Sequence, residues 1–256
     1  MTRSIAWQDG AIDAVDQCAL PHDYRLLRLR TVDEVIDAIQ RLAIRGAPAI
    51  GVAGALAVAL SARAHTSDGV CDEIAVRAEA QRIADARPTA VNLSWAVRRV
   101  IGKLGGGADA MLAEALEILT EDEQRNRAAA DQAADVVARL CGPGPLRLLT
   151  HCNTGRLATV AWGTALGAIR VLAGAGRVAT ARTIAVIPST LHQPQNDLLP
   201  PNGVKSLRLN RDLSAVPNTG ANKKSVGKNA LGFEIQGYCD GGVVACAHRS
   251  AGRVGI

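Results

Sequence analysis

Arg45 stands at the edge of an apolar segment and could bind an anion. It lies in "AIRGAPAIG", and from Ala47 to Leu60 the chain carries no charged or polar side chain. A guanidinium can make a two-pronged contact with phosphate, and a helix starting just after it would add free N–H groups and a positive dipole end. Gly46 and Ala47 are small enough to let a ligand approach the backbone. The pattern indicates an anion site at residues 45–47; the alternative for a single arginine is a side chain that extends to solvent.

A second arginine has a similar position further along the chain. Arg87, in "ARPTAVNLSW", lies at a helix junction interrupted by proline, just before Asn92, which we predict to be a helix N-cap. This again places a cation beside the start of a helix. Two such cations are suited to an anion that is held from two sides.

The third group is Cys152, in "LLTHCNTGRLA", which follows a predicted strand and precedes a predicted helix. Ligands of parallel α/β domains bind at the carboxyl ends of strands, and a helix N-terminus lowers the pKa of a nearby thiol. Cys152 is therefore a candidate acid, base or nucleophile, the alternative being a small buried apolar residue. His151 should point to the opposite side of an extended segment, so no Cys–His pair is predicted. The cysteines show no C-x-x-C spacing, and no metal site is predicted.

The elements that would hold the two arginines are mainly helical, in a domain that we place at 1–143. "TVDEVIDAIQRLAI" begins with Thr31 and has Glu34 three residues on, as in a capping box, and its apolar residues fall on one helical face. The next helix has Pro48 in its first turn and runs through "AIGVAGALAVALSARA", which is apolar nearly all round and should be central to the domain. Further helices are predicted at about 71–86, from Asn92 onward and across 108–140.

The chain then changes to an α/β pattern. After "CGPGP", the stretch "LRLLTHCN" is typical of a buried strand, and "TGRLATVAWGTALGAIRVLAGAG" is typical of a helix ended by glycines. Strand, tight turn and helix form the opening unit of a parallel α/β domain, which we place at 144–178. Residues 179–256 form a divergent basic tail in which "TIAVIPST" could be a strand and no fold is predicted.

Composition argues against several classes of partner. The net charge is +5, but residues 171–256 hold ten Lys and Arg against four Asp and Glu, so the basic excess lies in the last third. With 2% aromatic residues the chain lacks platforms for stacked bases, and no nucleic-acid partner is predicted. The apolar run after Arg45 is shorter than the roughly 20 residues of a spanning helix, so no membrane partner is predicted. Six scattered cysteines and the lack of a leader pattern favour free thiols in the cytoplasm.

The motifs together resemble one enzyme family. "AIRGAPAIG", "RPTAVNLSWA" and "LTHCNTGRLATVAWGTALGAIR", preceded by "VDQCALP", resemble in order and spacing the successive motifs of the methylthioribose-1-phosphate isomerase family. The resemblance extends over roughly residues 5–178. It implies an N-terminal helical domain followed by a Rossmann-like α/β domain, incomplete in this chain, and homodimers if the second domain folds.

The resemblance also implies roles for the candidate residues. Arg45, Gly46 and Ala47, with Arg87, would hold a sugar phosphate, and Cys152 would take part in proton transfer or charge stabilisation. The reaction of the family converts 5-methylthioribose 1-phosphate into 5-methylthioribulose 1-phosphate in methionine salvage. No metal or organic cofactor is expected from the resemblance.

The last third departs from the family pattern. The "GADR" motif, whose aspartate is the family's partner for the cysteine, is absent, and so is an "ETRP" motif. In "RDLSAVPNTGANKK", Asp212 precedes Asn222 and Lys223 with the spacing that the family has after its aspartate, although the residues between them barely match. A shifted reading frame, a truncation or a real rearrangement would each explain this tail. The departure predicts little or no isomerase activity for this chain.

Two other functions are compatible with the motifs. The regulatory subunits of the eukaryotic initiation factor that exchanges guanine nucleotide share the fold and act in assembly rather than catalysis. A related isomerase acting on ribose 1,5-bisphosphate is the closer alternative. The intact "RGAPAIG" and "THCNTG" motifs favour the enzymes.

Overall fold

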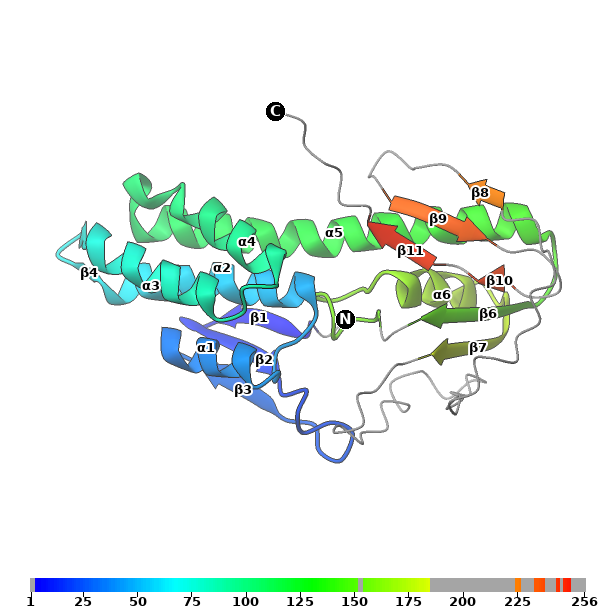
Figure 1. Ribbon diagram of the computed structural model, residues 1–256, viewed down its shortest axis with the longest axis horizontal. Coiled ribbons are helices and arrows are strands. Elements are labelled where there is room, and N and C mark those ends of the chain that lie inside the picture. The colour runs from blue at the N-terminus through cyan, green and yellow to red at the C-terminus, as the bar shows by residue number, and fades with distance from the viewer. Residues whose placement is uncertain are drawn as a thin grey trace. The chain divides into compact units, whose positions relative to one another are not determined.

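The computed structural model describes residues 3–151 and 154–184, together with the backbone of short strands at 224–226, 233–237, 243–244 and 246–249. The chain divides into two compact units (Figure 1). The first unit comprises Met1–Arg125 and Arg156–Trp162, and the second comprises Asn126–Gly155 and Gly163–Ile256. Each unit is described separately below.

The first unit begins with a small antiparallel sheet. Strands β1 (Ile5–Gln8), β2 (Ala11–Val15) and β3 (Leu26–Leu29) pair in the order β1-β2-β3. This sheet is absent from the sequence prediction, because each strand has only four or five residues and short apolar runs do not distinguish strand from helix. The mainly helical part of the unit therefore starts only after β3.

Helix α1 (Val32–Gln40) confirms the predicted capping box. The Thr31 hydroxyl oxygen accepts the Glu34 N–H at 3.2 Å, and the Glu34 carboxylate accepts the Thr31 N–H at 3.0 Å. These two bonds satisfy N–H groups that have no partner inside the helix. The buried face of α1 carries Val32, Val35, Ala38 and Ile39, as the helical spacing predicts.

Helix α2 (Ala47–Ala64) is the central helix of the first unit, as predicted. Pro48 lies in its first turn, and every residue from Ala49 to Ala62 is buried. It contacts α1, α3 (Glu73–Asp85), α4 (Val91–Ile101) and strands β1 and β2. By length and composition α2 could also cross a membrane, but 78% of it is buried inside the structure, as expected of a core helix.

Two details of this region differ from the prediction. Asn92 is not the N-cap of α4, because the helix already begins at Val91 and Ala90 occupies the cap position without a side-chain hydrogen bond. A hairpin of β4 (Thr66–Ser67) and β5 (Val70–Cys71) precedes α3, so the predicted 71–86 helix starts two residues later. A short 3-10 helix, η1 (Leu104–Gly106), then leads into α5.

Helix α5 (Gly107–Cys141) is one continuous helix of 35 residues, close to the predicted range, and the boundary between the units falls inside it. Its N-terminal part is joined to α4 through Arg99. The Arg99 guanidinium makes two bonds of 2.7 and 2.8 Å to the Glu121 carboxylate and one of 2.5 Å to Glu114. The hydrogen bond from Arg99 holds the pKa of Glu121 below its usual value, with further lowering by the charge of Arg125.

Replacing Arg99 with methionine should lower the free energy of unfolding by about 1–3 kcal/mol, between the values for exposed and for buried ion pairs. Because the pKa of Glu121 is lower in the folded state, the stabilisation is present above the unfolded pKa of about 4.3 and lost as pH falls through the folded pKa. Urea unfolding followed by circular dichroism should therefore show a difference at neutral pH that shrinks in acid.

The matched control for this prediction is Arg77→Met. Arg77 pairs with Glu73 on the surface of α3, where both side chains are more than half exposed. Its removal should cost at most about 0.5 kcal/mol. Equal losses for Arg77→Met and Arg99→Met would contradict a special contribution of the α4–α5 network.

The second unit contains a parallel strand–helix–strand arrangement, of which the sequence predicted the first strand and the helix. Strand β6 (Leu146–His151) pairs in parallel with β7 (Val178–Ile184), helix α6 (Ala165–Gly174) lies between them in sequence, and β10 (Val243–Val244) pairs in parallel with the other edge of β6. Strands β8 (Lys224–Val226), β9 (Phe233–Gly237) and β11 (Cys246–Arg249) form a separate antiparallel sheet in the order β11-β9-β8. The architecture is thus a mixed α/β one.

The helix predicted to start at residue 154 begins only at Ala165. The preceding residues turn back on themselves, since the Thr164 N–H donates to the Thr154 carbonyl at 2.9 Å. Gly163 has φ of 88°, and a Cβ there would lie 2.7 Å from Gly155 Cα. A helix cannot pass through this close approach, which is the physical reason for its late start. The following strand also starts earlier than the predicted 183–190 segment.

Candidate anion-binding site

The turn between α1 and α2 requires glycine at position 46. Gly46 has φ of 96°, in the left-handed region, and serves as N-cap of α2 without a side chain. A Cβ on it would lie 2.5 Å from both the Cα and the carbonyl oxygen of Ala158. Ala158 belongs to the Arg156–Trp162 segment of the same unit. Gly46 thus allows both the tight turn and the close packing of two backbones.

The start of α2 leaves a backbone donor free beside Arg45. The Ile50 N–H donates to the Gly46 carbonyl at 2.9 Å, and the Ala49 N–H donates to the Ala158 carbonyl at 3.3 Å. Pro48 has no N–H, and the Ala47 N–H has no acceptor among the residues that the structure describes. A free N–H at the positive end of a long helix is a favourable contact for an anion.

The Arg45 guanidinium has only part of its hydrogen-bonding capacity satisfied. Its Nε–H donates to the Gln17 side-chain oxygen at 3.2 Å, whereas Nη2 is buried and has no acceptor within the described part of the chain. A buried donor without an acceptor is costly, and such atoms are rare in folded proteins. The arrangement indicates that a ligand supplies the missing acceptor.

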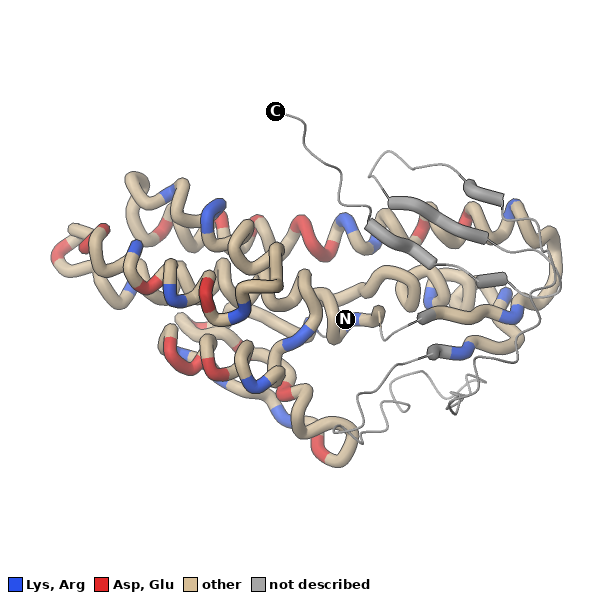
Figure 2. The backbone as a smooth tube through the Cα atoms, in the orientation of Figure 1, with Lys and Arg blue, Asp and Glu red and all other residues tan. Residues whose placement is uncertain are grey.

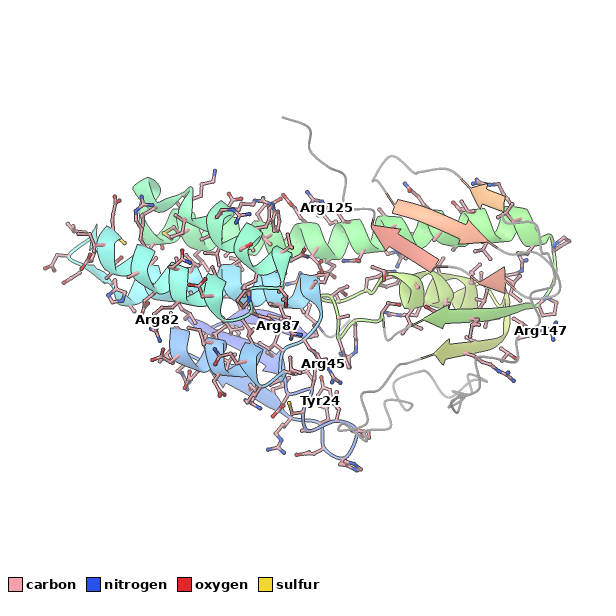
Figure 3. The ribbon with its side chains drawn as sticks, viewed as in Figure 1. Tyr24, Arg45, Arg82, Arg87, Arg125 and Arg147 are labelled. Carbon is pink, nitrogen blue, oxygen red and sulfur yellow. The ribbon has the colours of Figure 1, made fainter. Side chains whose placement is uncertain are left out.

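Arg87 follows the end of α3, in the turn that leads to α4. Its side chain is half-buried, and the described residues offer it no carboxylate or other hydrogen-bonding partner. A Cβ on Gly51 would lie 3.0 Å from the Asn92 carbonyl oxygen, so the start of α4 lies against the first turns of α2. Figure 3 accordingly shows Arg45 and Arg87 near the same end of α2. Both arginines therefore lie near the start of α2, and the binding of an anion by them stays a prediction.

Several other arginines of the first unit are neutralised by neighbouring carboxylates. Figure 2 shows acidic and basic positions interleaved along its helices. Ion pairs join Arg28 to Asp13, Arg41 to Asp37, Arg82 to Asp33 and Arg99 to Glu121. Arg45 and Arg87 differ from these in being half-buried with no ion pair among the described residues, which leaves their charge for a ligand.

Cys152 lies outside the described residues, and so do Asp212, Asn222 and Lys223. β6 ends at His151, and α6 begins only at Ala165. The prediction that a helix begins directly after Cys152 is therefore wrong. A role for Cys152 rests on the resemblance alone.

Two contacts of the site were missed by the sequence prediction. Gln17 lies in "VDQCALP", a motif used only for the resemblance, and it is the hydrogen-bond partner of Arg45. Ala158 follows the "THCNTG" motif and packs on Gly46. The presence of both in family-like motifs is the signal that could have pointed to them.

These features define a mixed α/β protein in which Arg45, with a buried donor that lacks an acceptor among the described residues, lies at the start of the central helix of the first unit. The chain belongs to the initiation factor 2 subunit family, whose model matches residues 43–190. That match includes Arg45, Gly46, Ala47, Arg87 and Cys152.

Curated relatives match about two thirds of the chain. The chain is 67% identical over 175 residues to a probable bifunctional methylthioribose-1-phosphate isomerase/methylthioribulose-1-phosphate dehydratase of Nocardia farcinica. The aligned region covers 68% of this chain and 32% of that protein. The chain is 48% identical over 171 residues to a methylthioribose-1-phosphate isomerase of Anaeromyxobacter dehalogenans, and the aligned region covers 66% of this chain and 48% of that protein. A 5-deoxyribose 1-phosphate isomerase of Moorella thermoacetica is 41% identical over 186 residues, covering 68% and 51%. The chain thus spans about a third to a half of the length of these relatives.

The solved structures with a similar fold include an isomerase and a translation factor subunit. A 5-methylthioribose 1-phosphate isomerase from Pyrococcus horikoshii superposes with a TM-score of 0.68 at 27% identity, over 81% of this chain and 60% of that one. The delta subunit of translation initiation factor eIF-2B from A. fulgidus superposes with a TM-score of 0.65 at 33% identity, over 81% and 62%. The fold is therefore shared by named enzymes and by a named translation factor subunit.

Proposed function

We propose that this chain is an aldose–ketose isomerase of the methylthioribose-1-phosphate isomerase type, in which Arg45, Gly46, Ala47 and Arg87 bind the phosphate of the substrate. The observation that carries the proposal is the buried Arg45 Nη2, which has no acceptor among the described residues; the Ala47 N–H, two residues on in sequence, has none there either. The names of the relatives from Nocardia and Anaeromyxobacter support the choice of substrate. Methionine salvage is the corresponding process.

The phosphate anchors would leave the sugar ring free for the chemistry. Because C1 carries the phosphate ester, the ring opens by protonation of the ring oxygen as its bond to C1 breaks. Hydrogen then moves with its electron pair from C2 to C1, and the C2 hydroxyl loses its proton to become the carbonyl of the ketose. One group that donates and one that accepts a proton are sufficient for both steps, and exclusion of water strengthens their action. We propose Cys152 as one of these groups. No metal or organic cofactor takes part in this scheme.

The proposal also covers the domain organisation, the cellular location, the oligomeric state and the partners of the protein. The second unit, with its parallel β6 and β7, would be the beginning of a Rossmann-like domain. The protein would act in the cytoplasm as a homodimer, with a small sugar phosphate as ligand and neither nucleic acid nor membrane as partner. The domains would divide at 1–143 and 144–178, followed by the tail at 179–256.

A second candidate function is a non-catalytic assembly subunit of the translation factor type. The observation in its favour is the superposition with the delta subunit from A. fulgidus at 33% identity. A phosphate anchor favours the isomerases, because the names of the relatives include a sugar 1-phosphate as substrate. A 1-phosphate of a different pentose, such as 5-deoxyribose 1-phosphate or ribose 1,5-bisphosphate, would use the same anchor.

The full chain should bind 5-methylthioribose 1-phosphate but turn it over slowly. Calorimetric titration should give clear binding of the sugar phosphate and none of 5-methylthioribose, which lacks the phosphate. Turnover followed by NMR should be about 10²- to 10⁴-fold below that of an isomerase with the "GADR" motif, the usual contribution of a positioned proton-transfer partner. Equal affinity for the two sugars would contradict the phosphate site and favour the assembly subunit. Robust turnover that disappears in Asp212→Asn would show that the tail completes the catalytic site.

A further inference from the structure

Gln17 contacts Arg45 from the loop that follows β2. The residue is 4% exposed. Its side-chain oxygen accepts the Arg45 Nε–H at 3.2 Å, and its side-chain nitrogen donates to the Leu157 carbonyl at 2.8 Å. Because a guanidinium can only donate and a carbonyl oxygen can only accept, these two neighbours determine which way the amide group points. Gln17 therefore connects Arg45 to the Arg156–Trp162 segment in a single orientation.

The backbone holds Gln17 in place for this contact. The Gln17 N–H donates to the Ala43 carbonyl at 3.0 Å, two residues before Arg45. On the preceding residue, the Asp16 N–H donates to the Arg25 carbonyl at 3.1 Å, and the Asp16 carboxylate accepts the Cys18 N–H at 3.0 Å. With both its backbone and its amide fixed, the Gln17 oxygen is a rigid acceptor for the Arg45 Nε–H.

A neutral amide suits this position better than a carboxylate. It binds one edge of the Arg45 guanidinium and leaves both the full positive charge and the buried Nη2 donor for a ligand. A carboxylate at position 17 would neutralise Arg45 and compete with the anion. It would also face the Leu157 carbonyl without a proton to donate, an unfavourable contact in a buried place.

We propose that Gln17 is a positioning residue that aims the Arg45 guanidinium at the bound anion. The proposal rests on the proposed function, in which Arg45 binds phosphate. Through Leu157, Gln17 also supports the neighbouring Ala158, which packs on Gly46 and accepts the Ala49 N–H. The buried Gln17 amide thus supports both Arg45 and, through Leu157, the backbone that contacts the start of α2.

Gln17→Met should weaken binding of inorganic phosphate to the full chain about tenfold, because the lost bond is to a charged group. Phosphate affinity is measured by NMR chemical-shift titration. The Arg45 Nε–H signal, assigned by its absence in Arg45→Lys, should exchange with water faster in Gln17→Met than in the unaltered chain. Gln17→Glu, which preserves the size of the side chain, should lose phosphate binding at least as strongly, since its carboxylate neutralises Arg45.

The matched control is Ser4→Ala. The Ser4 hydroxyl is also buried and shares its proton between the Thr159 and Val160 carbonyls at 2.8 and 3.0 Å, so its removal perturbs the segment at these residues and leaves the Gln17 bonds to Arg45 and Leu157 in place. Ser4→Ala should keep the phosphate affinity of the unaltered chain. An equal loss in Ser4→Ala, or an unchanged affinity in folded Gln17→Met or Gln17→Glu, would overturn the positioning role.

Arg45→Ala separates this proposal from the proposed function. If Arg45→Ala weakens phosphate binding and the Gln17 variants do not, only the positioning role is lost. If Arg45→Ala binds phosphate as tightly as the unaltered chain, or if the unaltered chain does not bind phosphate at all, both the anion site and the role of Gln17 are refuted.

Discussion

Replacing Gly46 with alanine should destabilise the first unit by roughly 2–5 kcal/mol and abolish phosphate binding. Two costs add. An alanine pays about 1–2 kcal/mol to adopt the left-handed backbone conformation, here with φ of 96°. Its Cβ would also lie 2.5 Å from the backbone of Ala158, which has to move away. Urea unfolding gives the loss of stability, and chemical-shift titration with phosphate gives the loss of binding.

The control for the backbone cost is Gly69→Ala. Gly69 has φ of 78°, but no atom lies within 4 Å of a Cβ placed on it. It lies in the turn of the β4–β5 hairpin, so its replacement should cost only about 1–2 kcal/mol and leave phosphate affinity unchanged. Equal destabilisation by the two substitutions would mean that the packing of Ala158 on Gly46 contributes nothing.

The second large effect is expected for Arg45→Ala, which should weaken binding of phosphate and of 5-methylthioribose 1-phosphate about 10- to 100-fold. A hydrogen bond to a charged group contributes about 1.5–3 kcal/mol, and the buried Nη2 is the donor left for the ligand. The substitution removes a side chain that lacks an ion pair among the described residues, so the fold should remain intact by circular dichroism. Calorimetric titration measures the affinity.

Arg63→Ala provides the control for the loss of one positive charge. Arg63 is exposed in the last turn of α2, the same helix whose first turn holds the proposed anion site. If the effect of Arg45 were only a general attraction of anions to a positive protein, Arg63→Ala would weaken phosphate binding similarly. Unchanged affinity in folded Arg45→Ala would remove Arg45 from the phosphate site.

The parts of the fold that the sequence predicts correctly are those that local interactions determine. The capping box of α1 involves residues three apart, and the uniformly apolar composition of α2 identifies it as a core helix without any knowledge of its neighbours. Strand β6 and helix α6 also follow from local pattern, although the helix begins later than predicted, whereas the parallel pairing of β7 with β6 was not predicted. The residues of the Arg45–Ala47 turn could be identified because they combine a cation, a glycine and a helix start.

The contacts that complete the site could not be predicted, because they join distant parts of the chain. Gln17 and Leu157 are 140 residues apart in sequence, and the contact of Gly46 with Ala158 spans a similar distance. A single sequence carries no periodic signal for such pairs. The early β1–β3 sheet was missed for another reason, since its short strands gain their stability from packing on the helices rather than from their own propensity.

The return of Arg156–Trp162 to the first unit sets an order of events during protein synthesis. Val160 and Ala161 are fully buried in the core of that unit, and the Asp122 carboxylate accepts the Val160 N–H at 2.9 Å. When the ribosome has made residues 1–125, the core of the first unit is still incomplete. The rest of α5 and all of β6 must be synthesised before the Arg156–Trp162 segment that completes this core. Domains generally fold as units as the chain emerges. In the nascent first unit, Gly46 can therefore pack on Ala158, and the proposed phosphate site can form, only after Ala158 has left the exit tunnel.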